Sequence, residues 1–243
     1  MTRPAPEQPP VDRAAGAPVG RRVVLGMLGL AGFGVLLGSR ISDSVASIAA
    51  KDPTGLLGFL PGGGRFRIYC VVGNVEPIAP AAYQLAVGGA VATSSRLGFA
   101  DLAALPQSVL TKDVQCVTGW RVPDVTWSGV LLRDLLDHVG ADPNAAMVTF
   151  GSSDGVYTES LSMAQARRDD VLVALTMDGE PVSDDHGGPV RLYVAAMYFY
   201  KSLKWLDRIT VGDRAEPGYW EQRGYDIDAW VGESNGRRDD PIV

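Results

Sequence analysis

Three short stretches of this chain combine side chains that bind metals and anions. In the first, residues 113–123 (DVQCVTGWRVP), Cys116 stands between an apolar segment and a turn. The others are residues 185–191 (DHGGPVR) and 201–205 (KSLKW), which gather cationic and hydroxyl groups. A thiolate is a ligand for soft and borderline metals, and Arg and Lys bind phosphate-like anions. A single cysteine is more often a buried apolar residue, so the ligand hypothesis depends on all three stretches together.

Taken with residues 127–132 (WSGVLL), these stretches resemble the molybdopterin-binding domain of the sulfite oxidase superfamily, and the resemblance extends from about residue 65 to residue 235. The cysteine context CVTGW is less similar to the sulfite oxidases proper, which have Ala-Gly-Asn-Arg there. It is more similar to the bacterial branch that contains the periplasmic methionine sulfoxide reductase catalytic subunit. The resemblance implies a molybdenum-cofactor-dependent oxidoreductase that transfers an oxygen atom to or from a small molecule or an oxidised side chain, with two electrons.

The same resemblance assigns candidate site residues. Cys116 would be the thiolate ligand of the metal in Mo-molybdopterin and a catalytic residue. The pterin carries a phosphate and many hydrogen-bonding edges, and the positions that match its contacts in the family are Arg67, Tyr69, Ser152, His186, Arg191, Lys201, Ser202 and Lys204. Strand packing is the alternative for Arg67 and Tyr69. Arg191 and Lys204 would otherwise be solvated strand-edge charges, and His186 a turn residue.

The chain departs from the family pattern at two positions. Phe199 stands where a glycine is expected in a Tyr-Gly-Tyr-Lys-Ser type of loop. The Arg-Arg pair that follows the cysteine in sulfite oxidases is replaced by Gly119-Trp120-Arg121. Arg121 remains a candidate catalytic residue for an anionic substrate, but sulfite is not the substrate that this pattern favours.

Other interpretations of Cys116 stay open. It would form a cysteine hydrolase dyad with His186 or His138, although residues 201–205 would then have no role. The domain would alternatively be a binding module that kept the fold and lost catalysis. In an oxidising compartment, a disulfide between Cys70 and Cys116 would prevent metal binding.

The pattern of elements predicts an α+β fold with mixed sheets and short helices. Strands outnumber helices and do not alternate regularly with them, which is untypical of a layered α/β fold. We expect a strand over residues 65–73, which opens the domain, because apolar and polar residues alternate there. Apolar residues at helical spacing predict a helix over residues 128–139.

The N-terminal residues suggest a leader. Residues 1–20 are proline-rich and predict a flexible tail. Arg21 and Arg22 precede an uncharged run that ends at Gly38, which is the pattern of twin-arginine export within residues 21–50. This run has about 16 residues, fewer than the ~20 that span a bilayer, so cleavage before Ala50 and retention as a membrane-contacting anchor both stay open. Residues 51–243 would then be a monomeric catalytic domain at the outer face of the cytoplasmic membrane, or in the periplasm or extracellular space.

Composition and motifs limit the classes of partner that we expect. The 28 acidic and 22 basic residues give a net charge of −6, which argues against nucleic acid. The sequence has no Cys-x-x-Cys-His haem motif, so we expect a separate electron-transfer partner, for which a membrane cytochrome b is a candidate.

Changing Arg21 and Arg22 together to Lys should leave the protein in the cytoplasm with its cofactor bound. The export receptor reads paired guanidinium groups rather than charge alone. Cell fractionation with metal analysis measures this, and normal export of the double variant would contradict the twin-arginine interpretation.

Overall fold

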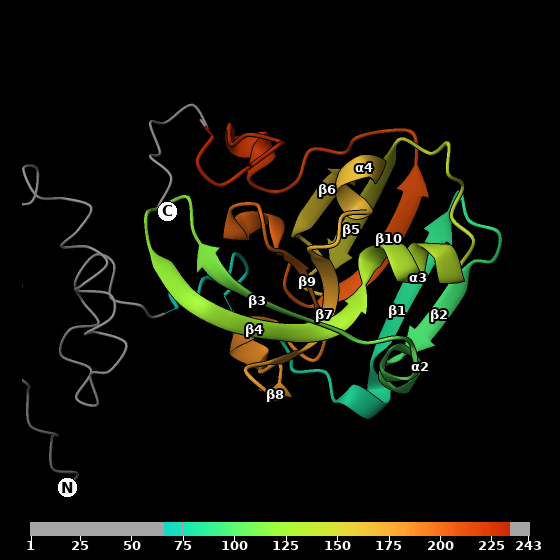
Figure 1. The fold of residues 1–243 in the computed structure, drawn as a ribbon, viewed down its shortest axis with the longest axis horizontal. Coiled ribbons are helices and arrows are strands. Elements are labelled where there is room, and N and C mark those ends of the chain that lie inside the picture. Colours follow the sequence, from blue (N-terminus) through green and yellow to red (C-terminus); the bar gives the residue numbers. More distant parts are fainter. Residues whose placement is uncertain (1–65, 74, 234–243) are drawn as a thin grey trace, which may run out of the picture. The chain divides into compact units, whose positions relative to one another are not determined.

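The computed structural model describes residues 66–73 and 75–233 of the 243-residue chain. The predicted tail at 1–20 and the predicted export segment at 21–50 lie outside the described residues and stay predictions. Within the described ranges, the chain forms two β-sheets accompanied by short helices (Figure 1). This is the α+β class that the sequence predicts.

The first sheet has the strand order β2-β1-β10-β5-β6. Its strands are β1 (Gln84–Gly89), β2 (Ser95–Gly98), β5 (Met147–Ser152), β6 (Thr158–Ser162) and β10 (Leu206–Gly212). The pair β1 and β10 is parallel, and the other neighbours are antiparallel. A late strand therefore lies between two early ones, so the sheet is complete only when residues far apart in the chain have come together.

The second sheet has the order β3-β4-β7-β8, with β9 also paired to β7. Its strands are β3 (Ser108–Gln115), β4 (Arg121–Leu131), β7 (Val171–Met177), β8 (Glu180–Pro181) and β9 (Arg191–Val194). Strand β4 is long and curved (Figure 1). Because β3 and β4 are antiparallel neighbours, the turn that joins them presents Cys116 at one end of this sheet.

The helices are short. They are η1 (Pro80–Ala82), α2 (Phe99–Ala104), α3 (Leu132–His138), α4 (Met163–Ala166), η2 (Asp184–His186), η3 (Phe199–Lys201) and η4 (Glu221–Arg223). A capping box begins α4: the Gln165 N–H donates to Ser162 Oγ at 3.2 Å, and the Ser162 N–H donates to Gln165 Oε1 at 2.8 Å. No helix among the described residues has the length and apolar character needed to cross a membrane.

Two predicted elements differ in the structure. The described part of the predicted strand over 65–73 has no strand pairing. Residues 66–71 line a cavity instead. The predicted helix over 128–139 begins only at Leu132. Residues 128–131 belong to β4, since Gly129 and Val130 pair with Ala174 and Val173 of β7. Helical spacing of leucines alone does not reveal this cross-strand pairing.

The buried apolar residues form two clusters. The larger one includes Leu132, Leu135 and Leu136 of α3 and residues from both sheets, and the smaller one contains Trp127 and Tyr193. Cys116 packs against both clusters. The thiol therefore lies where the two cores meet.

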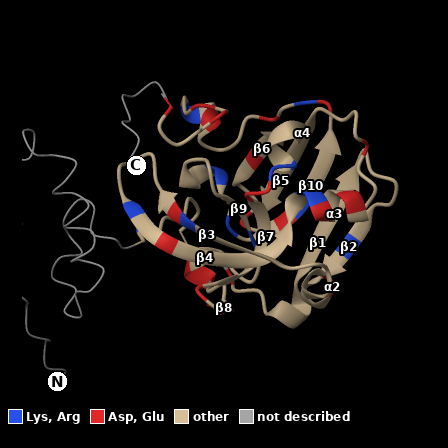
Figure 2. Cartoon of the chain, viewed as in Figure 1, with Lys and Arg blue, Asp and Glu red and all other residues tan. Residues whose placement is uncertain are grey.

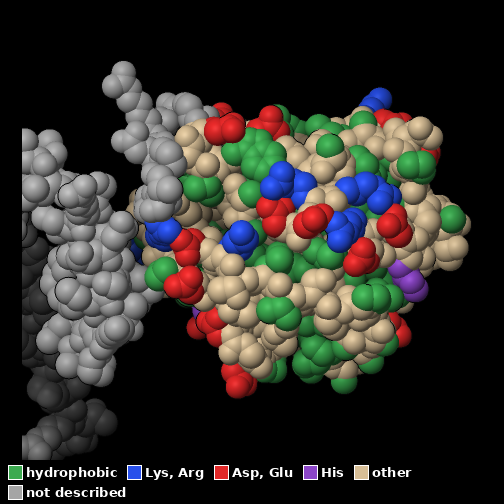
Figure 3. All heavy atoms as spheres, viewed as in Figure 1, with side chains coloured by type: hydrophobic (Ala, Val, Ile, Leu, Met, Phe, Trp, Pro, Cys, Tyr) green, Lys and Arg blue, Asp and Glu red, His purple; other side chains and the backbone are tan. Residues whose placement is uncertain are grey.

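Charged side chains of both signs are interspersed over the elements (Figure 2). On the face drawn in Figure 3, blue and red side chains adjoin one another. The surface ion pairs include Arg167–Asp137 and Arg168–Asp170, each at 2.7 Å. Surface ion pairs contribute little to the free energy of unfolding. Because their charges are opposite, this part of the surface has no strong electrostatic potential of one sign.

Candidate functional site

A cavity of about 220 Å³ lies beside Cys116. Its lining comes from five parts of the chain that are far apart in sequence: residues 66–71, 116–118, 154–157, 185–205 and 220–225. Most of the predicted site residues contribute to it. Those that line the cavity are Arg67, Tyr69, Cys116, His186, Arg191, Ser202 and Lys204.

A tight turn presents the Cys116 thiol. The Cys116 N–H donates to the Trp120 carbonyl at 2.9 Å, and the Gly119 N–H donates to the Cys116 carbonyl at 2.9 Å. Gly119 has φ +93°, a left-handed conformation that glycine adopts without strain. The Thr118 hydroxyl donates to Cys116 Sγ at 3.3 Å. The sulfur is thus a free, partly buried thiol that faces the cavity with one hydroxyl donor beside it.

Arg191 is a buried cation at the cavity wall, with 1% of its surface exposed. Its Nη1 donates to the His186 carbonyl and its Nη2 to the Ser202 carbonyl, each at 2.6 Å. No carboxylate in the described ranges forms an ion pair with it. Burial lowers the pKa of Arg191 to about 9, so the group is charged at neutral pH. Carbonyl oxygens carry only partial charge, and the site therefore suits an anion.

Phe199 helps to hold this cation. The guanidinium carbon of Arg191 lies 4.4 Å from the Phe199 ring centroid and 5.1 Å from that of Trp127. Ring faces attract cations and shield them from water. The sequence departure at Phe199 therefore has a structural role, since the phenyl ring covers the guanidinium that a glycine would leave uncovered.

Two further nitrogen groups line the cavity near Arg191. Lys204 Nζ lies 3.1 Å from the Asp185 carbonyl and 4.1 Å from the Trp205 ring centroid. Burial, followed by the charge of Arg191, lowers the pKa of Lys204 to about 8. Burial, and then Arg191 and Lys204, also lower the pKa of His186, so its imidazole is neutral at pH 7. The cavity wall thus has a charged guanidinium at Arg191, an ammonium at Lys204 that loses its charge near pH 8, and a neutral imidazole at His186. These groups suit a phosphate and hydrogen-bonding heteroatoms.

Three predicted site residues, Ser152, Lys201 and Arg121, are not in the cavity lining. Ser152 is buried, and its hydroxyl accepts the Asp154 N–H at 3.3 Å, which shapes the turn after β5. Lys201 is fully buried, with its ammonium 2.6 Å from Glu159 and also in contact with Glu221. The cofactor roles of Ser152 and Lys201 stay predictions, and both residues sit beside rather than on the cavity surface. Ser202, which does line the cavity, accepts the Val194 N–H through Oγ at 3.0 Å.

Arg121 forms an ion pair with Asp113 across the β3–β4 hairpin and is absent from the cavity lining. Burial alone would raise the pKa of Asp113, but hydrogen bonds from Arg121 and from the Asp124 backbone lower it below its usual value. The carboxylate therefore stays charged and keeps the guanidinium engaged. The catalytic role predicted for Arg121 has no support from this geometry.

An aromatic wall was missed by the sequence interpretation. It consists of Tyr157, Tyr200, Trp220 and Tyr225, which all line the cavity. The Tyr157 hydroxyl donates to the Tyr200 carbonyl at 2.7 Å, and the rings of Trp220 and Tyr225 lie 5.4 Å apart. The concentration of aromatic residues at 219–225 was the available signal. Cys70 also lines the cavity, and both cysteines are free thiols rather than a disulfide.

The chain is similar to several known proteins. Residues 72–220 match the family model described as an oxidoreductase molybdopterin binding domain. The oxidoreductase YuiH of Bacillus subtilis is 34% identical over 150 residues, which cover 61% of this chain and 75% of YuiH. The "Putative protein-methionine-sulfoxide reductase subunit YedZ1" of Azospira oryzae is 33% identical over 170 residues, or 70% of this chain and 63% of that protein.

The mitochondrial sulfite oxidase of Drosophila melanogaster is 30% identical over 177 residues, covering 62% of this chain but 31% of the oxidase. Among solved structures, the sulfane dehydrogenase SoxCD of Paracoccus pantotrophus aligns with a TM-score of 0.53 and 23% identity, over 58% of this chain and 40% of that one. The SoxCD match shows the fold alone. This chain spans well under two thirds of the sulfite oxidase and SoxCD chains.

Replacing Gly187 with Ala should disturb the cationic part of the cavity. A Cβ at Gly187 would lie 2.3 Å from Lys204 Cβ and 2.6 Å from Lys204 Cα, so the backbone that carries Lys204 must move. We expect a loss of about 1–3 kcal/mol in the free energy of unfolding, measured by urea denaturation. Gly155→Ala is the matched control, because its φ of +73° is also left-handed while its Cβ meets nothing within 4 Å. Equal losses in the two variants would show that backbone strain, not contact with Lys204, is the cause.

Proposed function

Because the chain belongs to the family of oxidoreductase molybdopterin-binding domains within the sulfite oxidase superfamily, we propose that this molybdenum-cofactor-dependent oxidoreductase removes an oxygen atom from a neutral sulfoxide. The carrying observation is that Cys116 and the buried Arg191 face the same cavity. Mo-molybdopterin needs two groups from the protein: a thiolate that ligates the metal and a cation that binds the pterin phosphate. The residues present therefore fit Mo-molybdopterin.

The chain's own groups have distinct tasks in this proposal. Cys116 would ligate the metal as a thiolate, and the Thr118 hydroxyl, which donates to Sγ at 3.3 Å, would orient it. Arg191 and Lys204 bind the phosphate and ring edges of the pterin. The aromatic wall excludes water from the reacting side of the cavity. When bound, the cofactor would supply the two-electron redox change that removal of the oxygen atom requires.

The choice of a neutral substrate follows from Arg121. Oxyanion substrates need a cation that is available to them, and Arg121, the first cation after the Cys116 turn, is paired with Asp113. A sulfoxide has no charge to neutralise, and its alkyl groups suit aromatic surfaces. The similarity to the Azospira protein, which is named as a methionine-sulfoxide reductase subunit, favours an oxidised methionine side chain.

The proposed reaction consumes two electrons and two protons and releases a sulfide and water. The electrons come from a separate protein, in agreement with the word subunit in the name of the Azospira relative, and we propose a membrane cytochrome b for this role. Export by the twin-arginine route would place the enzyme where such a partner reaches it.

The substrate proposal is tested with protein purified from a molybdenum-replete host. Methionine sulfoxide, with a reduced viologen dye as electron donor, should be turned over, and sulfite with an oxidising dye should not. Faster turnover of sulfite than of the sulfoxide would overturn the neutral-substrate proposal. Protein that carries the full molybdenum content and reduces no sulfoxide would overturn it as well.

Cys116→Ser should abolish activity while the fold is kept, because the change in side-chain volume is small. Loss of outer-shell partners already costs about 10–100-fold in activity or metal affinity, so loss of the ligand should cost at least about 100-fold. The sulfur-to-metal charge-transfer absorption should disappear as well. Cys70→Ser is the control, since it removes the other thiol of the cavity, and it should be mild. Full turnover by Cys116→Ser would refute the ligand assignment.

Arg191→Lys should weaken cofactor retention, because an ammonium keeps the charge but loses the forked geometry that reaches two carbonyls and an anion together. Charge-assisted contacts of this kind contribute about 1.5–3 kcal/mol, or roughly tenfold to a hundredfold in affinity. The molybdenum-to-protein ratio after dialysis is the measurement. Arg96→Lys, an exposed change in β2, should leave the ratio unchanged. An unchanged ratio for Arg191→Lys would remove the pterin role.

A further inference from the structure

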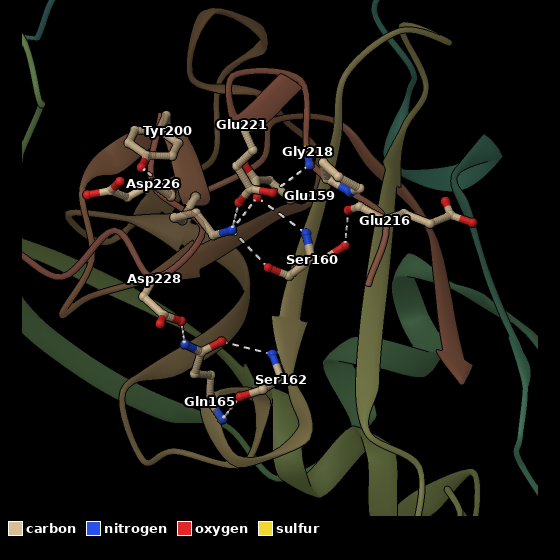
Figure 4. A network of polar contacts seen from close by, with 12 residues as sticks. Glu159, Ser160, Ser162, Gln165, Tyr200, Glu216, Gly218, Glu221, Asp226 and Asp228 are labelled. Carbon is tan, nitrogen blue, oxygen red and sulfur yellow. Dashed lines mark hydrogen bonds and ion pairs between the residues drawn. The ribbon is translucent and has the colours of Figure 1, made fainter. Parts of the chain in front are cut away.

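Three charged side chains meet behind the aromatic wall and are removed from water. Lys201 of η3 is 0% exposed, Glu159 of β6 is 1% exposed and Glu221 of η4 is 9% exposed. Lys201 Nζ lies 2.6 Å from Glu159 Oε2 and also contacts Glu221 Oε1. Figure 4 shows the Glu159 and Glu221 carboxylates close together, with Ser160 and Gly218 beside them. The cluster joins three segments that are far apart in sequence.

One carboxylate oxygen of this cluster, Glu159 Oε1, accepts no hydrogen bond from the described residues. The Lys201 ammonium donates to the Ser160 carbonyl at 2.8 Å as well as to the two carboxylates, so its three donors are used. Both oxygens of Glu221 accept: Oε1 from Lys201, and Oε2 from the Gly218 N–H at 2.6 Å. Glu159 Oε2 accepts from Lys201 and, at 3.3 Å, from the Ser160 N–H. Glu159 Oε1 has no hydrogen-bond partner in the described part of the chain.

This count of donors decides where a proton resides. Two ionised carboxylates and one ammonium would leave a net negative charge in the interior, at a cost of several kcal/mol. A proton on one carboxylate makes the cluster neutral. Each carboxylate has two donors, but both donors of Glu159 go to Oε2, so Glu159 is the carboxylate with an oxygen that accepts no hydrogen bond within the described ranges. Burial raises the pKa of Glu159 to about 8, with Lys201 acting against the rise and Glu221 adding to it.

We propose that Glu159, protonated on Oε1, acts with Lys201 and Glu221 as a clasp that positions the aromatic wall of the cavity. Each clasp residue is next to, or two positions from, a wall residue: Tyr157 precedes Glu159, Tyr200 precedes Lys201 and Trp220 precedes Glu221. The Tyr157 hydroxyl also donates to the Tyr200 carbonyl. The three segments that form the wall are thus held to one another through one neutral cluster of buried charges.

The clasp makes the wall sensitive to alkaline pH. The charged and titratable groups that face Glu159 are Lys201 from η3, Glu221 from η4 and the Tyr157 hydroxyl. An unfolded glutamate ionises near pH 4.5, whereas the folded one does so near pH 8. The contribution of Glu159 to folding is therefore complete below about pH 4.5 and declines as the pH rises to 8. Above that pH the folded clasp carries one negative charge that Lys201 does not balance.

The proposal is tested by replacing each of the two carboxylates that contact the Lys201 ammonium with the neutral amide. Glu159→Gln resembles the protonated acid, so the variant should fold, bind molybdenum to within about twofold of wild type and keep its melting temperature. Glu221→Gln removes the only ionised partner of Lys201, and its molybdenum content should fall at least about tenfold. Equal losses in the two variants, or failure of Glu159→Gln to fold, would overturn the proposal.

A pH series supplies the readout that a purely structural role for Glu159 would not change. The molybdenum content of wild-type holoenzyme, measured after incubation between pH 6 and pH 10 and desalting, should fall more steeply above about pH 8 than that of Glu159→Gln. Loss of the Lys204 charge weakens cofactor binding in both proteins, whereas ionisation of Glu159 occurs only in wild type. Infrared spectra should show the carbonyl band of a protonated carboxyl at pH 7 in wild type, absent from Glu159→Gln. A band that persists in the variant, or the same alkaline loss in both proteins, would contradict a proton on Glu159. The test involves no substrate and is independent of the sulfoxide proposal.

Discussion

A guanidinium removed from water at the edge of a cavity is the constraint on which the site depends. Arg191 begins β9, a buried strand paired to β7, and its donors point to carbonyl oxygens of the loops on either side. Taking such a charge out of water costs several kcal/mol. Carbonyl oxygens and the faces of Phe199 and Trp127 offset part of this cost. An anionic cofactor group bound in the cavity would offset more of it, which would link cofactor binding to the stability of this region.

Lys201 and Arg191, the two fully buried cations of the described structure, have different kinds of partner. Lys201 has two carboxylates and a carbonyl around it and is isolated from the cavity. Arg191 has carbonyls and ring faces only, and it lines the cavity. A buried cation already paired with carboxylates has little attraction left for an incoming anion, whereas one that meets only dipoles keeps it. The difference in partners therefore separates a structural cation from a binding one.

The cavity is formed by turns and loops, while the sheets hold those turns in place. The β3–β4 hairpin presents Cys116, and the segment between β8 and β9 presents His186. Because sheet pairing fixes the ends of each loop, side chains on loops can still have defined positions. The same hairpin also engages Arg121 with Asp113. One hairpin thus directs the Cys116 thiol to the cavity and keeps the Arg121 guanidinium in an ion pair away from it.

The sequence alone determined the family, the α+β class and the residues whose chemistry depends on their immediate neighbours. Cys116, His186, Arg191 and Lys204 stand in short motifs. Local alternation was a poorer guide, since the described part of residues 65–73 alternates and forms no strand. Arg191 and Lys201 are both buried cations, and no local pattern distinguishes their roles.

Only the tertiary structure decided those roles. The partners of Lys201 are Glu159 and Glu221, which lie on either side of it in the chain and meet it only in the folded protein. Likewise, residues 128–131 are strand rather than helix because β7 pairs with them. The aromatic wall exists because three separate segments converge on one cavity. Burial, charge pairing and strand pairing are properties of long-range contacts, and the spacing of residues along the chain contains no record of which distant partner each will meet.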